Sequence, residues 1–312
     1  MKIGMILDTT FPPDARVENE GYSLIEAGHE VFLFCLDFGS KKPSESINGI
    51  QIRRYKSNTL IYKLSALAYT FPFYHYLLLP KLKKFIKEIN PDVLHVNDMV
   101  IAEAVFKVNR NYQLPVVLDL HQNRPEIMKY SKHVTGTLGK MFINLDKWKR
   151  WQNILIEKAT KVILVTEEAR NLAVNQTNLP AENFHVVPNT ITPSIFYGYK
   201  IDNEIINQFR STFNVLYLGD TGLRRGTDTA ISAVSKLKHK IPEIRLILVG
   251  KSSADEMLKR IAQSLDVVEN VKFLGWRDLK LFPSFIVASD ICISPLKRNV
   301  HHDTTFANKI FQ

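Results

Sequence analysis

Short segments in which nearly every residue is apolar alternate with longer segments of helical periodicity along most of the chain. Residues 2–7 and 161–166 are examples of the first kind, and residues 16–27 and 227–238 are examples of the second. A strand that is apolar throughout must be buried on both faces, because successive side chains point to opposite sides of a sheet. Helices between such strands act as crossovers over a parallel sheet. The alternation therefore predicts an α/β fold.

The strand and helix series runs twice. A polar connector near residues 192–211 separates the two runs, which predicts two Rossmann-like domains, residues 1–198 and residues 199–312. The second run offers four strands, so we expect this second domain to be incomplete. The predicted strands are 2–7, 30–36, 50–55, 92–97, 115–120, 161–166, 184–187, 215–218, 245–249, 271–274 and 291–294. The predicted helices include 16–27, 101–109, 148–159, 167–175, 227–238, 254–265 and 279–288.

Composition narrows the class of protein. The 312 residues are 45% hydrophobic and 23% charged. This apolar content is enough for two hydrophobic cores of ordinary size and excludes a disordered chain. The first apolar run is too short for a signal peptide and ends at Asp8, so we expect a cytoplasmic protein. Cys35 and Cys292 each lie in an apolar run, which predicts two reduced core thiols.

The net charge of +10 is concentrated in one tract, residues 53–87, which contains no Asp or Glu. The stretch 60–80 inside it is rich in Leu, Tyr and Phe, but Lys63, Pro72 and Pro80 interrupt it, which argues against a membrane-spanning helix. Two interpretations stay open. The tract docks on an anionic membrane surface as a peripheral contact, or it is a packed helix pair with a solvated basic edge. The sequence carries no nucleic-acid-binding motif.

In open parallel sheets, ligands bind in the crevice at the carboxyl ends of the strands, so we expect the binding residues in the loops that follow strands. The first such loop presents Asp14 and Arg16 at a helix start, where the helix N-terminus favours anions. Helix capping and a surface ion pair explain these residues more simply. The loop after 115–120 is more informative, because His121 stands close to Asp119, Arg124 and Glu126. This density of polar residues after a buried strand indicates contact with substrate.

The segment from Gly219 to Gly226 joins a predicted strand to a predicted helix. Its glycines allow tight turns, and Arg224 and Arg225 are fixed cations that fork onto phosphate oxygens. The start of the following helix adds a partial positive charge. The glycine spacing differs from the dinucleotide fingerprint, and Gly-Lys-Ser/Thr is missing, so neither a dinucleotide site nor a P-loop is indicated. The segment predicts a diphosphate site.

Three more strand ends belong to the same edge of the second domain: Lys251 after Gly250, the run Gly275-Trp276-Arg277, and residues 294–297. The pair His301-His302 stands beside Asp303, but adjacent residues rarely both bind a metal, so we expect no metal site. No Asp-x-Asp triplet occurs. Protein cations rather than a metal or another cofactor would then neutralise a leaving diphosphate.

Taken together and in order, these motifs resemble the family 4 glycosyltransferases of the GT-B fold. The likeness is carried by the run 14–20 with the run 24–31, by 91–95, by Asp119-Leu120-His121, by Val187-Pro188-Asn189, by 219–226, by 273–276, by 288–296 and by Asn308-Lys309-Ile310-Phe311-Gln312. The resemblance implies transfer of a sugar from a nucleotide diphosphate sugar to a glycan or lipid-linked acceptor. It further implies retention of configuration, independence from metal, and a place in the synthesis of cell-surface polysaccharide or glycolipid.

The resemblance also assigns roles to residues. His121 would face the transferred sugar and Arg225 the donor diphosphate, as the two catalytic residues. Asp14, Arg16 and Glu126 would lie on the acceptor side. The donor would be bound by Gly219, Thr221, Arg224, Arg225, Lys251, Gly275, Trp276, Arg277, Thr304, Lys309 and Gln312.

The sequence departs from the family pattern at several positions. Asp220 stands where Arg often follows the first glycine, and Thr190 stands where Gly is usual. Thr304 and Gln312 occupy the positions of the family's two glutamates, of which the second binds ribose hydroxyls. Glutamine accepts such a hydrogen bond without charge assistance. We expect a chain that is truncated at its C-terminus, and an inactive fragment or a sugar-nucleotide-binding module is the alternative to an active enzyme.

Overall fold

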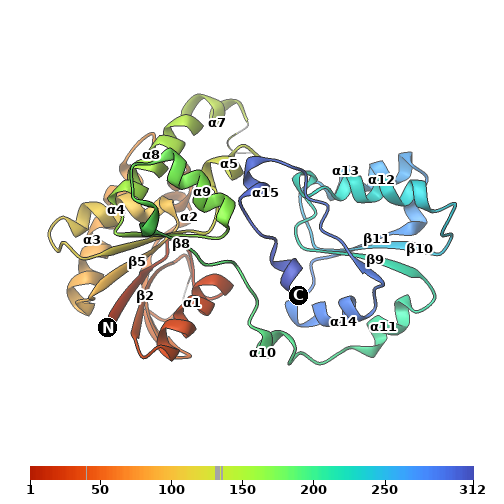
Figure 1. Ribbon diagram of the computed structural model, residues 1–312, viewed down its shortest axis with the longest axis horizontal. Coiled ribbons are helices and arrows are strands. Elements are labelled where there is room, and N and C mark those ends of the chain that lie inside the picture. Colours follow the sequence, from red (N-terminus) through yellow and green to blue (C-terminus); the bar gives the residue numbers. More distant parts are fainter. Residues whose placement is uncertain (40, 131–133, 135) are drawn as a thin grey trace. The chain divides into compact units, whose positions relative to one another are not determined.

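The computed structural model describes residues 1–39, 41–130, 134 and 136–312. Contacts divide these residues into two compact units, which are Met1–Asn189 with Asp303–Phe306, and Thr190–His302 with Ala307–Gln312. Each unit is built on one mainly parallel β-sheet with helices packed on it (Figure 1), which confirms the predicted α/β class. The boundary that the sequence predicts at 198–199 lies between α10 (Pro193–Phe196) and α11 (Asn203–Phe209).

The sheet of the first unit has the strand order β3-β4-β2-β1-β5-β6-β7-β8. All its neighbouring strands are parallel except β3 and β4, which form a hairpin through Asn48 and Gly49, both with positive φ. The sequence does not predict β3, because three of the four residues of this edge strand are polar and it lacks an apolar pattern. The strands are β1 (Lys2–Ile6), β2 (Glu30–Asp37), β3 (Ser44–Ile47), β4 (Ile50–Lys56), β5 (Val93–Asn97), β6 (Val116–Leu120), β7 (Lys161–Leu164) and β8 (Phe184–Val186).

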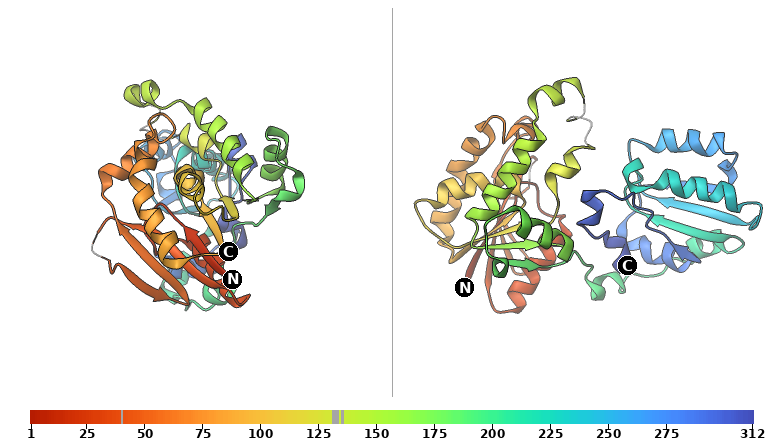
Figure 2. Two further views of the ribbon diagram at one scale, coloured as in Figure 1. Left: turned by 90° about the vertical axis from the view of Figure 1, so that its left-hand side faces the viewer. Right: turned by 45° about the horizontal axis from the view of Figure 1, so that its top comes forward.

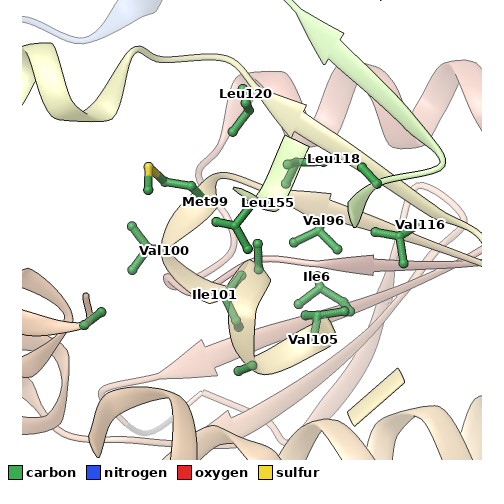
Figure 3. Packing of buried hydrophobic residues seen from close by; sticks show 14 of the residues in the cluster. Ile6, Val96, Met99, Val100, Ile101, Val105, Val116, Leu118, Leu120 and Leu155 are labelled. Carbon is green, nitrogen blue, oxygen red and sulfur yellow. The ribbon is translucent and has the colours of Figure 1, made fainter. Parts of the chain in front are cut away.

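Apolar side chains on both faces of this sheet form the core of the first unit. Alternate residues of β2 show the division: Leu33 and Cys35 pack in the cluster that includes Val17 of α1, whereas Phe34 and Leu36 pack in the cluster that includes α3, α4 and α8. Figure 3 shows the second cluster, with side chains of α4 and α8 beside those of the sheet. The helices are α1 (Ala15–Glu26), α2 (Thr59–Leu64), η1 (Ser65–Leu67), α3 (Phe73–Ile89), α4 (Met99–Asn109), α5 (Arg124–Met128), α7 (Thr137–Phe142), α8 (Leu145–Lys158), α9 (Glu167–Gln176) and η2 (Ala181–Asn183).

The basic tract 53–87 combines buried and exposed parts. On α3, Tyr74, Leu78 and Phe85 are buried in the core, while Phe73 and Tyr76 remain exposed. In the part of the chain that the structure describes, no helix combines the length and the apolar character that crossing a membrane requires. The tract therefore begins in β4, continues as helices of which α3 packs on the core, and also presents aromatic side chains to the surface.

The second unit has a four-stranded parallel sheet of order β11-β10-β9-β12. Its two faces are covered by separate apolar clusters, one with α12 and α13 and the other with α11 and α14, and Figure 2 shows this unit from two further directions. The strands are β9 (Phe213–Leu218), β10 (Ile244–Val249), β11 (Val271–Gly275) and β12 (Ile291–Cys292). The further helices are α12 (Thr227–Leu237), α13 (Asp255–Ser264), α14 (Phe282–Val287), α15 (Val300–Asp303), η3 (Leu223–Arg225), η4 (Val268–Asn270), η5 (Leu279–Leu281) and η6 (Asn308–Phe311).

The prediction of two buried thiols is half right. Cys35, a residue of β2, is buried, whereas Cys292 is exposed. The reason is its position on β12, which pairs with β9 at the edge of the sheet. Burial also raises the pKa of the Cys35 thiol, to about 11, so it stays protonated at neutral pH.

Candidate functional site

Charged side chains gather at the carboxyl ends of three adjacent strands in the first unit. Asp8 follows β1, Asp98 follows β5, and Asp119 lies in β6, two residues before His121. The strands lie in the order β1-β5-β6, and because parallel strands end at the same edge, these groups share one edge of the sheet. All three carboxylates are at least nine-tenths buried, so this edge of the sheet gathers buried charged groups.

Arg16 of α1 is the centre of this group. Its Nε and Nη2 lie 2.7 and 2.9 Å from the two carboxylate oxygens of Asp119, and Nη2 lies 2.8 Å from Oε1 of Glu20. Its Nη1 donates to the carbonyl oxygen of Val187 at 3.1 Å and to Oδ1 of Asn189 at 3.0 Å. The side chain is only 8% exposed. Arg16 thus ties α1 to the end of β6 and to the segment that follows β8.

His121 lies directly beyond this ion pair, with its Nδ1 3.7 Å from Oδ2 of Asp119. Burial lowers the pKa of His121, but the adjacent Asp119 carboxylate raises it by more, so the net direction is upward. The pKa of Asp119 is lowered, because Arg16 and His121 outweigh the upward effect of its burial. Each of these two side chains therefore stabilises the charged form of the other.

Glu20, His95 and Asp119 form a compact group of potential metal ligands. One ligand atom from each lies within 4.8 Å of the others. Burial and the nearby Asp119 raise the pKa of Glu20, and burial lowers that of His95. Arg16 contacts both carboxyl groups, and its guanidinium compensates the negative charge of Asp119. Among the described residues, His301, His302 and Asp303 do not assemble into a group of this kind.

A second set of contacts involves Asp98, Arg124 and Asp8. Asp98 caps α4 with φ 72° and ψ 156°, a conformation that non-glycine residues rarely adopt and that is often found at functional sites. Its Oδ2 lies 3.5 Å from Nε of Arg124. Tyr74 donates a hydrogen bond to Asp8 at 3.2 Å, and burial raises the pKa of Asp8 to about 6. These groups extend the charged edge toward the start of α5.

The structure gives the other predicted acceptor-side residues local partners. Asp14 is the N-cap of α1 and accepts hydrogen bonds from the backbone of Arg16 and Val17, both at 3.1 Å. Glu126 lies in the first turn of α5 and pairs with Lys129 at 2.7 Å. Both are adjacent in sequence to the charged edge, and their part in acceptor binding stays a prediction.

In the second unit, two glycines have a backbone that only glycine can follow, one inside the predicted diphosphate loop and one directly after β10. Gly226 has φ 77°, and a Cβ there would lie 1.7 Å from the carbonyl oxygen of Pro295. Gly250 has φ 146°, and a Cβ there would lie 1.8 Å from the carbonyl oxygen of Gly219. The end of β9 therefore lies close to the end of β10, and the start of α12 lies close to the loop before α15.

Three cationic side chains stand at this loop. Nη2 of Arg224 lies 2.9 Å from Oδ2 of Asp220, and Nε of Arg225 lies 3.7 Å from the same oxygen. Nζ of Lys309, in η6, lies 3.4 Å from the centre of the Tyr217 ring. It makes no hydrogen bond within the described part of the chain, and burial together with Arg225 lowers its pKa to about 7. The structure thus brings Arg224, Arg225 and Lys309 together around Gly219–Gly226.

The remaining predicted donor-side residues lie in four different places. Thr221 is buried, hydrogen-bonds Asp255 through its hydroxyl, and accepts from Thr227 through its carbonyl at 2.8 Å. Lys251, Gly275, Trp276 and Arg277 line the exposed ends of β10 and β11, and Trp276 is 73% exposed. Gln312 follows η6 and has a buried Oε1. By its contacts Thr304 belongs to the first unit, where it lines a small pocket with Leu120 and Gln122.

Glu20, His95 and Asp98 were not predicted as site residues from the sequence. A usable signal was present for two of them, because His95 lies in a predicted strand and Asp98 directly after it, at the edge where ligands bind. Glu20 lies one helical turn after Arg16, which places both side chains on one face of α1. Reading α1 and the strand ends together would have found this cluster.

Comparison with known proteins adds independent evidence. The sequence model described as Glycosyltransferase Family 4 matches residues 16–194, and the model described as Glycosyl transferases group 1 matches residues 201–301. An alpha-D-kanosaminyltransferase from Streptomyces kanamyceticus is 21% identical over 202 residues, which cover 61% of this chain and 49% of that protein. A phosphatidyl-myo-inositol mannosyltransferase from Mycolicibacterium smegmatis is 24% identical over 305 residues, which cover 95% of this chain and 70% of that protein.

The match to a glycosyltransferase from Haemophilus influenzae, at 25% identity, covers 82% of this chain and 63% of that protein. The chain thus spans about half to two thirds of the length of several curated relatives that it matches. Among solved structures, sucrose-phosphate synthase from Thermosynechococcus elongatus has a TM-score of 0.72 at 16% identity, covering 95% of this chain and 75% of that one. HepE from Anabaena, solved with UDP and glucose, has a TM-score of 0.62 at 18% identity, covering 94% and 73%. These likenesses confirm the expected two-unit GT-B fold.

Proposed function

The chain belongs to glycosyltransferase family 4, and on this premise we propose that it transfers a sugar from a nucleotide diphosphate sugar to an acceptor. The observation that carries the proposal is the loop Gly219–Gly226 with Arg224, Arg225 and Lys309 around it. Two guanidinium groups and an ammonium at a glycine-rich turn match the charge and the fork geometry of a diphosphate. The second unit is therefore proposed as the donor-binding unit.

The start of α12 supports the same assignment. Its N-cap, Gly226, has no side chain to accept hydrogen bonds from the first turn, and the helix is 11 residues long. Backbone N–H groups at such a terminus and the helix dipole both favour an anion. The donor diphosphate would be bound by this terminus together with Arg225.

We propose that the reaction needs no metal ion and retains the configuration of the transferred sugar. The leaving diphosphate gains negative charge as the glycosidic bond breaks, and fixed cations stabilise that charge without reorganisation. Arg224, Arg225 and Lys309 are in place to do this. Retention rests on the resemblance to family 4, and assay of the product's anomeric configuration tests it.

His121 is proposed to hold the transferred sugar. Asp119 lies on the Nδ1 side of the ring, so Nε2 is the ring nitrogen that faces away from that carboxylate. A histidine whose pKa is raised by such a neighbour donates hydrogen bonds from both nitrogens in its protonated form. A sugar hydroxyl is a fitting acceptor for the second one, and Arg16 keeps Asp119 in position.

We further propose that the acceptor is a lipid-linked or polysaccharide glycan met at an anionic membrane surface. Phe71 and Phe73 are both exposed, with ring centroids 6.3 Å apart. Thr70 donates to the carbonyl of Phe142 at 2.8 Å, which places the exposed end of α7 beside them. Exposed lysines of the same tract are Lys63, Lys83, Lys84 and Lys87. Exposed aromatic side chains and exposed lysines on the same tract suit the interface of an anionic bilayer. The mannosyltransferase relative is named for a phosphatidyl-myo-inositol acceptor.

A donor panel tests the function. Purified protein would be incubated with UDP-, GDP- and ADP-sugars, with and without lipid extract, and release of the nucleoside diphosphate would be measured. We expect one donor class to be turned over, and His121→Ala to lower kcat/KM by about 100-fold or more. The exposed His185 offers a matched control, and His185→Ala should leave the rate unchanged. Absence of turnover with every donor, or equal rates in the two variants, would refute the proposal.

A further inference from the structure

A carboxylate stands inside the loop that is proposed to bind the donor diphosphate. Asp220 directly follows Gly219, at the end of β9. Its Oδ2 lies 2.9 Å from Nη2 of Arg224 and 3.7 Å from Nε of Arg225. The two guanidinium groups that would bind phosphate oxygens therefore already face an anion that belongs to the protein.

Several contacts fix Asp220 in this position. Its Oδ1 accepts a hydrogen bond from the backbone N–H of Gly222 at 2.9 Å. Its carbonyl oxygen accepts from the hydroxyl of the buried Tyr217 at 2.6 Å. The Asp220 carboxylate is thus held over the arginines by the loop itself, rather than by chance rotation of a free side chain.

The other carboxylates near this loop are paired elsewhere. Asp228, in the first turn of α12, pairs with Lys297 at 2.7 Å. Asp255 accepts from the hydroxyl of Thr221 and from the backbone of Ser252. Asp220 is therefore the carboxylate whose partners are the cations proposed for the diphosphate.

We propose that Asp220 is an internal stand-in for the donor diphosphate, which must displace its carboxylate from Arg224 and Arg225 in order to bind. This inference rests on the proposed function of the loop. Oxygens of Asp220 and of a phosphate compete for the same N–H groups, and an anion on the same chain competes at a high effective concentration. The carboxylate offsets part of the positive charge of the empty site and helps the product diphosphate to leave.

The surrounding charges are compatible with this exchange. Lys309 makes no hydrogen bond within the described residues, so its ammonium is available to the incoming diphosphate. His301 lies near both arginines, and burial together with His302 lowers its pKa to about 4, so it stays neutral and adds no competing charge. Displacing one oxygen of Asp220 leaves the other free to keep its bond to Gly222.

The test separates charge from loop geometry. Asp220→Asn keeps an oxygen that accepts from Gly222 and removes the negative charge. Isothermal titration would compare wild type, Asp220→Asn, Arg225→Ala and the control Asp266→Asn with UDP, GDP and ADP. Asp266 is an exposed aspartate of the same unit that pairs with Lys238. We expect Asp220→Asn to lower the Kd of the nucleoside diphosphate that binds wild type by about tenfold, and Asp266→Asn to change it less than twofold.

An unchanged or higher Kd for Asp220→Asn overturns the inference, because a residue that only shapes the loop does not gain affinity when it is altered. If Asp220→Asn does not show the cooperative thermal unfolding of the wild type, the titration is made with Asp220→Ser instead. The serine hydroxyl also accepts a hydrogen bond from Gly222. If no nucleoside diphosphate binds wild type, or Arg225→Ala binds as well as wild type, the proposed donor site itself fails. If Arg225→Ala weakens binding but Asp220→Asn does not tighten it, the proposed donor site stands and only the inference about Asp220 is overturned.

Discussion

The guanidinium of Arg16 holds both carboxylate oxygens of Asp119, at 2.7 and 2.9 Å, in a pair that is almost fully buried. The two residues are 103 positions apart in the chain, so the pair joins α1 to the end of β6. The same guanidinium donates to Val187 and Asn189, and Asp119 in turn raises the pKa of His121. One ion pair thus links the stability of the first unit to the residue proposed to hold the sugar.

Replacing Arg16 should strongly destabilise the first unit. Arg16→Met leaves the buried Asp119 without its bidentate partner, which costs about 3–5 kcal/mol. Urea unfolding followed by tryptophan fluorescence measures the loss, because Trp148 and Trp151 both lie in α8 of this unit. Arg53→Met is the control, since Arg53 and Glu88 form a more exposed pair at 3.3 Å worth less than about 1 kcal/mol. Equal losses in the two variants would contradict the assigned role.

His121 and His95 should titrate in opposite directions from the ordinary value of 6.5. Asp119 raises the pKa of His121 above 6.5 despite its burial, and burial lowers the pKa of His95 below it. The charged form of His121 therefore contributes stability that is complete below pH 6.5 and is lost as the pH rises through its folded-state pKa. Titration by NMR of the ring protons measures both values in the wild-type protein. A His121 pKa at or below that of His95 would disprove the coupling to Asp119.

The backbone at the proposed donor loop should not tolerate a side chain at Gly226. Gly226→Ala places a Cβ against the carbonyl of Pro295, so we expect a loss of about 3 kcal/mol or more, or failure of the second unit to fold. Gly275→Ala is a matched control, because Gly275 also has positive φ, at 67°, but an added Cβ would contact nothing within 4 Å. That variant should lose only about 1–2 kcal/mol. Thermal melts of both variants decide, and similar melting temperatures would show that the close approach is absent in solution.

Binding of a nucleoside diphosphate should tighten as the pH falls from 8.5 to 6.5. Burial and Arg225 lower the pKa of Lys309 from 10.5 to about 7, so Lys309 gains its charge in this range, and the diphosphate favours the charged form. Asp220 opposes the shift, and the neutral ring of Tyr217 contacts the ammonium. Lys309→Met should abolish most of the pH dependence of binding. Any pH dependence that remains is due to titration of the ligand's own phosphate. A wild-type affinity that stays constant over this range would contradict the role of Lys309.

The sequence predicted the strands and the main helices well, because burial on both faces of a parallel sheet imposes continuous apolar runs. It missed β3, whose hairpin depends on the Asn48-Gly49 turn and on pairing with β4 rather than on any apolar pattern. Cys292 was predicted to be buried and is exposed, since an apolar run does not tell an edge strand from a central one.

The site was predictable only where a motif lies in one continuous segment. The loop Gly219–Gly226 is such a segment, and its arginines were identified from the sequence. The cluster of Arg16, Glu20, His95 and Asp119 comes from α1, β5 and β6, so its geometry depends on the order of strands in the sheet. The pairing of Asp220 with Arg224 and Arg225 likewise depends on the backbone conformation of the loop, which residue types alone do not reveal.

The central claim is that the second unit binds a sugar nucleotide through its diphosphate at Gly219–Gly226. Isothermal titration with a matched nucleoside, nucleoside monophosphate and nucleoside diphosphate tests it most directly, in wild type, Arg225→Ala and the exposed-arginine control Arg260→Ala. We predict that one diphosphate binds at least tenfold more tightly than its nucleoside, and that Arg225→Ala removes this difference while Arg260→Ala preserves it. Equal binding of the nucleoside and the diphosphate, or a difference that survives in Arg225→Ala, would contradict the claim.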